Sequence, residues 1–185
     1  MNTEYVTMEQ IEAGLAHVLA SPRDQGKLEA IVIRPEEDQR QVCTLAYLSP
    51  EGGVEGDRWV TSSSLRLPDG RPDPRAQVSL MNARLLRMIA GSDERISLAG
   101  DNLVVDLDLS EANMPVGQKL SVGEVVLEIT DVPHTGCQKF ARRFGPDAVR
   151  FVNGADRRSL HLRGVYARIL RAGTLRVGDV LRKME

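Results

Sequence analysis

The chain has 185 residues, of which 42% are hydrophobic and 27% charged, and its formal net charge is −2. This composition is typical of a globular protein of one domain, or of one domain with a small appendage. No apolar run approaches the roughly 20 residues of a membrane span, and the first residues lack the pattern of a secretory signal. We therefore expect a cytoplasmic protein that does not bind membranes.

Charge is unevenly distributed along the chain. Residues 134–185 contain 12 of the 24 Lys and Arg residues but only 4 of the 26 Asp and Glu residues. The acidic and basic segments could pair across the fold, or the basic segment could form a pocket for phosphate or a similar anion. Nucleic acid is not an expected partner, because few aromatic residues lie among the basic ones.

The N-terminal part predicts a helix followed by a hairpin. Thr7 and Gln10 have the spacing of a capping box, and apolar residues follow at helical intervals. Residues 28–33 and 42–48 predict two strands around a charged turn. Cys43 lies inside the second strand, where we expect it to pack. The two cysteines of the chain are too few and too far apart for a disulfide framework or a zinc site.

A glycine-rich stretch over residues 52–56 comes next and is followed at once by Asp57, Arg58 and Trp59. Three glycines in five residues indicate unusual backbone angles or a close approach to a ligand. Arg58 and the backbone amides could face an anion while Asp57 holds the arginine or the loop. A tight turn is the alternative. We expect Trp59 to pack at the mouth of a β-barrel, the fold that the strands described below predict. Stacking of its ring on a ligand is the alternative.

The middle of the chain predicts short strands and one capped helix. Residues 77–81 predict a strand, and Asn82 is placed to cap a helix over residues 83–90 that Gly91 ends. Residues 103–109 alternate with the period of a half-buried strand. Further strands are predicted over residues 119–122, 125–129 and 164–170, with a last hairpin over 174–177 and 180–182.

Cys137 follows one of these strands at a corner that leads into a helix. Residues 141–144 predict a helical turn that Gly145-Pro146 stops, and a second short helix over 147–152 follows. A thiol at a helix start near cations has its thiolate favoured by the backbone amides and the positive charges. Thiolates are nucleophiles, sulfur carriers and soft-metal ligands. The alternative is a buried structural cysteine.

About ten short strands with regular glycine turns and a few short helices predict a mainly β fold, a closed or partly closed barrel. The stretches 116–120 and 177–181 are similar to each other, and both read as glycine turns that lead into barrel strands. We expect an N-terminal helical appendage over residues 1–27 and the barrel domain over residues 28–185.

Seven short motifs, taken together in this order, resemble the MOSC domain, which is named after the C-terminal domain of molybdenum cofactor sulfurase. The resemblance covers residues 28–185. The motifs are Gly-Val-Glu-Gly-Asp-Arg-Trp (53–59), Ser-Leu-Met-Asn (79–82), Leu-Ala-Gly-Asp-Asn-Leu (98–103), Pro-Val-Gly (115–117), Pro-His-Thr-Gly-Cys (133–137), Arg-Gly-Val-Tyr-Ala (163–167) and Val-Gly-Asp (177–179).

The resemblance implies a β-barrel, a pocket for the pterin-based molybdenum cofactor, and a cysteine that ligates molybdenum or carries sulfur. By position, Cys137 is that cysteine. The pterin phosphate would be held by some of the basic residues of the C-terminal segment, and His134 could act as a base or bond the ligand, unless it is only a turn histidine. The resemblance thus implies a cofactor site that includes Gly56, Asp57, Arg58, Asn102, His134, Lys139, Arg143, Arg163 and Gly164.

Three functions remain open on this basis. In the first, Cys137 ligates molybdenum and the protein reduces N-oxygenated compounds. The chain has no iron–sulfur cysteine cluster, so an electron-donor protein would be a partner. In the second, Cys137 carries a persulfide, and a cysteine desulfurase would supply the sulfur, because the chain has no pyridoxal-phosphate domain of its own. In the third, the barrel is a non-catalytic anion-binding module in which Cys137 only packs.

Overall fold

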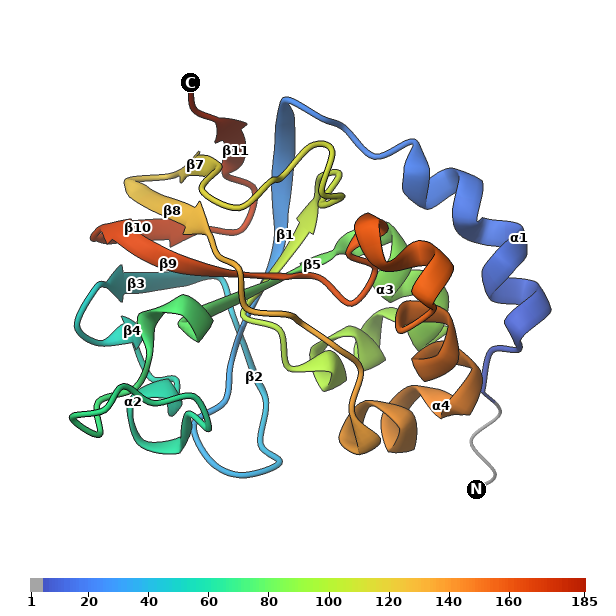
Figure 1. The fold of residues 1–185 in the computed structure, drawn as a ribbon, viewed down its shortest axis with the longest axis horizontal. Helices are drawn as coiled ribbons and strands as arrows, with labels where there is room; N and C mark the ends of the chain where they lie inside the picture. Colours follow the sequence, from blue (N-terminus) through green and yellow to red (C-terminus); the bar gives the residue numbers. More distant parts are fainter. Residues whose placement is uncertain (1–4) are drawn as a thin grey trace.

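The structure is a computed structural model that describes residues 5–185, and a closed seven-stranded β-barrel forms its centre (Figure 1). All neighbouring strands are antiparallel except β5 and β6, which are parallel. The barrel closes where β11 pairs with β1. This confirms the predicted fold class. Around the barrel the strands are β1 (Gln25–Ile33), β11 (Val180–Lys183), β7 (Lys119–Val122), β8 (Val125–Ile129), β9 (Val165–Arg171), β5 (Val78–Asn82) and β6 (Leu103–Asp106).

Four further strands lie outside the closed barrel. The predicted strand over residues 42–48 is divided into β2 (Gln41–Cys43), which pairs with β1 as expected, and β3 (Leu45–Ser49). β3 belongs to a separate three-stranded sheet with β4 (Gly53–Val54) and β10 (Gly173–Arg176).

The predicted hairpin over residues 174–177 and 180–182 is wrong, because β10 pairs with β3 whereas β11 pairs with β1 and β7. The turn between them is bonded to β1, where the amide of Gly178 donates to Leu28 and the amide of Leu28 donates to Asp179. The chain therefore passes from the small sheet into the barrel instead of folding back on itself.

The barrel strands are buried on two faces where helices cover them. Leu103 and Val105 of β6 belong to the core inside the barrel, whereas Val104 belongs to a second core under the helices. In β5, Leu80 likewise belongs to the core inside the barrel and Met81 to the core under the helices. The alternation expected for a half-buried strand is therefore absent from β6, because both of its faces are covered by apolar side chains.

Three helices lie together on one side of the barrel: α1 (Met8–Leu19), α3 (Ala83–Ala90) and α4 (Gln138–Val152) (Figure 1). Ile11, Leu85, Phe144 and Phe151 are among the buried residues of the core that they share. The capping box at Thr7 and the cap that Asn82 makes to the amide of Leu85 are present as predicted. The remaining helical segments are α2 (Trp59–Ser62) and the 3-10 turns η1 (Pro74–Ala76), η2 (Asp93–Ala99) and η3 (Ala155–Leu160).

The helix α4 contains the two helices that were predicted on either side of Gly145-Pro146. Gly145 has non-helical angles, with φ at 90°, and it kinks the helix. A Cβ at this position would lie 2.7 Å from the ring of Tyr5, so the close packing also requires glycine. Residues 1–4 of the predicted appendage lie outside the described residues. Among residues 5–185, no helix has the length and apolar character that a membrane crossing needs.

The glycine immediately before β9 allows very close contact with β5. Gly164 has φ at 99°, and a Cβ there would lie 2.1 Å from the carbonyl oxygen of Leu80. Gly178 has nearly the same φ, 98°, but a Cβ there would have no atom within 4 Å. The two glycines share the backbone constraint and differ only in the contact.

We predict that Gly164→Ala destabilises the protein more than Gly178→Ala. Both substitutions carry the backbone strain of a positive φ, about 1–3 kcal/mol. Only Gly164→Ala adds a clash with the β5 backbone, and overpacking of this kind costs a further ~1–3 kcal/mol. Urea unfolding of the two variants measures the difference, and equal free energies of unfolding would show that the contact does not matter.

Candidate functional site

Cys137 lies at the end of the connection between β8 and α4, where it is the N-cap residue of α4 and is exposed. The connection is held in place just before the cysteine. The amide of Gly136 donates to Oδ1 of Asn153 at 2.8 Å, and Nδ2 of Asn153 donates back to the carbonyl of Gly136 at 2.9 Å. Asn153 is the C-cap residue of α4, so the two ends of this kinked helix are tied together beside the thiol.

The surroundings of Cys137 favour its thiolate. Partial burial of the sulfur raises the pKa of Cys137, but the backbone amides of Phe140 and Lys139 and the charge of Arg163 lower it by more. The net result is a pKa below the ordinary value for cysteine. Cys43 differs in its environment, because it is half-buried and packs against the core of the barrel as expected.

Arg163 lies behind the thiol in a buried ion pair. Its Nη1 bonds both carboxylate oxygens of Asp101, at 2.9 and 2.7 Å, and its guanidinium lies 4.7 Å from the ring centroid of Phe140. Both side chains are at least nine-tenths buried. The charge of Arg163 therefore acts on Cys137 through space while its hydrogen bonds are made with Asp101.

His134 lies beside the same ion pair and stacks on Tyr166, with 4.3 Å between the ring centroids. Its Nε2 is 3.7 Å from Oδ1 of Asp101. The pKa of His134 is well below its usual value, first because the ring is buried and then because Arg163 and Arg34 repel a second positive charge. The imidazole is therefore neutral at pH 7.

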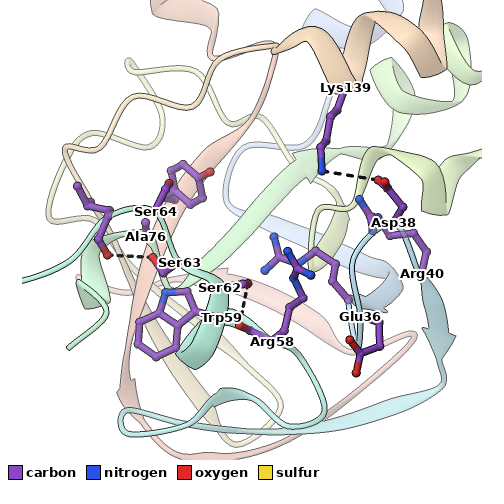
Figure 2. A pocket seen from close by; sticks show the side chains of 13 residues that line it. Glu36, Asp38, Arg40, Arg58, Trp59, Ser62, Ser63, Ser64, Ala76 and Lys139 are labelled. Carbon is purple, nitrogen blue, oxygen red and sulfur yellow. Dashed lines mark hydrogen bonds and ion pairs between the residues drawn. The ribbon is translucent and has the colours of Figure 1, made fainter. Parts of the chain in front are cut away.

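A polar cavity of about 230 Å³ lies next to this group, and we call it the basic cleft. Four cations line it: Arg34, Arg40, Arg58 and Lys139. Its wall also contains Trp59, Tyr166 and three consecutive serines, Ser62 to Ser64 (Figure 2).

Two buried donors in the basic cleft lack partners among the described residues: Nε of Arg40 and Nε1 of Trp59. Trp59 is 5% exposed. It thus packs in the wall, as expected, and its indole N–H is a buried donor.

The glycine-rich loop and the Asn102 corner form a hydrogen-bonded support for the basic cleft. Asp57 accepts from Nε and Nη2 of Arg34, both at 2.8 Å, from the backbone amide of Arg34 at 2.8 Å, and from the amide of Trp59 at 3.0 Å. Nδ2 of Asn102, which is fully buried, adds a bond of 3.2 Å to Asp57. Asp57 thus holds Arg34 and the loop, and Arg58 is left facing the cleft.

Gly56 and Gly164 allow backbone conformations and close contacts that this hydrogen-bonded support requires. Gly56 has φ at 81°, and a Cβ there would lie 2.9 Å from the side chain of Ile33. Gly164 allows β9 to approach β5, as described above. Of the residues placed in the cofactor site by the resemblance, Gly56, Asp57, Asn102 and Gly164 shape the site, whereas Arg58 and Lys139 line the basic cleft.

The charged turn between β1 and β2 faces the start of α4. Nζ of Lys139 is 2.8 Å from Oε1 of Glu37, and Nη2 of Arg143 is 2.8 Å from Oδ1 of Asp38. Figure 2 shows Lys139 reaching across the basic cleft toward Asp38, at 3.8 Å. These cations are thus paired with acidic residues of the N-terminal half.

Three of the four cations that line the basic cleft come from the acidic part of the chain, residues 1–133. An anion pocket was one of the two interpretations of the basic segment 134–185, but Arg34, Arg40 and Arg58 lie in the acidic part of the chain. Arg34 and Arg40 were not predicted as site residues. No local pattern identifies them, because an arginine at a strand end or in a charged turn is common and only the fold brings them to the cleft.

The comparisons with known proteins identify a family and similar folds. A family model described as the MOSC domain matches residues 73–182. A search of the curated proteins found no match.

Several solved structures are similar in fold. The YuaD protein from Bacillus subtilis is 16% identical, with a TM-score of 0.58, over 87% of this chain and 97% of that one. YiiM from Geobacillus stearothermophilus is 15% identical, with a TM-score of 0.56, over 86% and 75% of the two chains. YiiM from Escherichia coli is 16% identical, with a TM-score of 0.54, over 86% and 70%.

We predict that iodoacetamide alkylates Cys137 faster than Cys43 at pH 7. Cys137 is more exposed, and its lowered pKa increases the thiolate fraction at neutral pH and moves the rise of rate with pH to lower pH. Rates measured by mass spectrometry in Cys43→Ala and Cys137→Ala isolate each thiol. A Cys137 that reacts no faster than Cys43 would mean that the helix amides and Arg163 do not activate it.

Proposed function

Because the chain belongs to the MOSC domain family, we propose that it binds the molybdenum cofactor with the Cys137 thiolate as metal ligand. The basic cleft then holds the phosphate of the pterin. The observation that carries the proposal is an exposed cysteine of lowered pKa two residues before Lys139, which lines a cleft with three further cations.

The residues present fit such a group. Thiolate is a soft ligand suited to a metal of this kind, and a lowered pKa makes the ligating form more available. Arginine side chains bind phosphate oxygens through charge-assisted hydrogen bonds. The unpartnered donors of Arg40 and Trp59 are groups that ligand oxygens could satisfy, which matters because buried polar atoms in proteins are almost always bonded.

The reaction that we propose is the reduction of an N-oxygenated compound. Two electrons and two protons break the N–O bond, and the oxygen leaves as water. The cofactor supplies the two-electron redox chemistry when bound, and an electron-donor protein supplies the electrons. The chain itself holds Cys137 at a fixed corner, keeps cations around the cleft, and places the neutral His134 beside Asp101 close to the thiol.

We predict that apoprotein incubated with molybdenum cofactor retains molybdenum and pterin through Cys137. Wild type and Cys43→Ala should bind comparable amounts, and Cys137→Ala should lose the metal. Metal analysis and the fluorescence of the extracted pterin measure this. Retention of metal by Cys137→Ala at the wild-type level would contradict the role of the thiolate.

The basic cleft is tested in the same assay with Arg58→Gln. A hydrogen bond to a charged group contributes about 1.5–3 kcal/mol, so cofactor affinity should fall roughly 10- to 100-fold. Arg176→Gln is the matched control, because Arg176 is an exposed arginine of β10 that does not line the basic cleft.

A second candidate function is sulfur transfer, which the same exposed thiol of lowered pKa favours. In this function the Cys137 thiolate attacks the outer sulfur of a persulfide on a cysteine desulfurase; the S–S bond of the donor breaks, its cysteine leaves as a thiolate, and Cys137 becomes the persulfide. We predict a mass gain of one sulfur on Cys137 after exposure to a desulfurase and cysteine. Modification of Cys43 in preference to Cys137 would end this candidate.

The third possibility, a barrel that binds an anion without chemistry, requires no reactive thiol. A slow alkylation of Cys137, combined with phosphate binding that Arg58→Gln weakens, would favour it over the other two.

A further inference from the structure

A second cavity, of about 530 Å³, shares no lining residue with the basic cleft, and we call it the apolar cavity. Three segments enclose most of it: the end of β8 and the connection that follows (129–135), the end of α4 (152–154), and the approach to β9 (158–165). Its apolar lining includes Val116, Ile129, Val132, Val152, Leu162 and Val165.

His134 lines the apolar cavity and carries a buried atom that nothing satisfies. The side chain is 7% exposed, and its Nδ1 has no hydrogen-bond partner within the described part of the chain. Nε2 faces a carboxylate oxygen of Asp101, so the proton of the neutral ring belongs on Nε2. Nδ1 is then a bare acceptor. Because buried polar atoms are nearly always bonded in native proteins, this acceptor indicates a missing donor.

Charged side chains line the same cavity beside the apolar ones: Glu111, Asp131, Arg158 and Arg163. Nε of Arg163 is a second buried polar atom that has no partner among the described residues, and it is a donor. The cavity therefore presents one bare acceptor, Nδ1 of His134, and one unpartnered donor next to apolar walls. These groups favour a ligand that is partly apolar and carries an N–H donor for the histidine.

We propose that the apolar cavity binds a small, partly apolar molecule that donates an N–H hydrogen bond to Nδ1 of His134. This site goes beyond the cofactor function, because it lies outside the basic cleft. Asn153 and Thr135 line it, and Asn153 holds Gly136 immediately before Cys137. A molecule bound there therefore lies beside the segment that positions the thiol.

Indole and benzofuran test the proposal as a matched pair of probes. They have nearly the same size and shape, but only indole has an N–H donor. Titration of the apoprotein by calorimetry should show that indole binds about 3- to 10-fold more tightly, the value of one net hydrogen bond. In His134→Phe, which keeps a ring against Tyr166, the preference should disappear. His17→Phe, at an exposed position of α1, should keep it.

A second measurement needs no variant, in case His134→Phe does not fold. In wild-type protein with ¹⁵N-labelled histidine, indole should shift the Nδ1 resonance of His134 upfield, whereas benzofuran should leave it in place. Equal affinities for the two probes, no indole binding, or an unmoved Nδ1 resonance would overturn the proposal. Both experiments use protein without cofactor, so their failure would leave the molybdenum proposal untouched.

Discussion

The ion pair between Arg34 and Asp57 is the contact on which the basic cleft depends. Asp57 is almost fully buried, and it accepts hydrogen bonds from three donors of Arg34, from the backbone amide of Trp59 and from the side-chain Nδ2 of Asn102. Through these bonds it ties the end of β1, the glycine-rich loop and the start of β6 to one carboxylate. Each of these segments contributes to the cleft or its support, so losing the carboxylate would release all three and leave a half-buried arginine unpaired.

A second buried pair, Arg163 with Asp101, adds a positive charge to the effect of the helix amides on the pKa of the thiol. Both side chains are nine-tenths buried or more, and breaking such a pair costs about 3–5 kcal/mol because one charge is left unpaired. The pair lies next to His134 and Phe140 and acts on Cys137 through space. The site therefore combines an exposed nucleophile with charges that are held rigidly and out of solvent. In this arrangement the charge of Arg163 stabilises the thiolate through space.

The distribution of charge shows why a sequence asymmetry can mislead. Several cations of the basic C-terminal segment pair with acidic residues of the N-terminal part: Lys139 with Glu37, Arg143 with Asp38, Arg157 with Glu12 and Arg163 with Asp101. The expectation that acidic and basic segments pair across the fold thus accounts for these four. Three of the four cations that line the basic cleft, Arg34, Arg40 and Arg58, lie instead in the acidic segment. Net charge along the sequence therefore does not show which cations face a cavity.

The sequence alone determined the features that depend on neighbours along the chain. The caps at Thr7 and Asn82, the helix break at Gly145-Pro146, the strands β7 and β8 and the position of Cys137 at a helix start all follow from local spacing and backbone preference. The ordered motifs also pointed to the family. Tertiary structure alone decided which strands pair, as the separation of β10 from β11 shows, because pairing depends on contacts between residues distant in sequence. It also brought Arg34 and Arg40 to the cleft and left Nδ1 of His134 without a partner among residues 5–185, since burial and hydrogen bonding arise only when separate segments pack together.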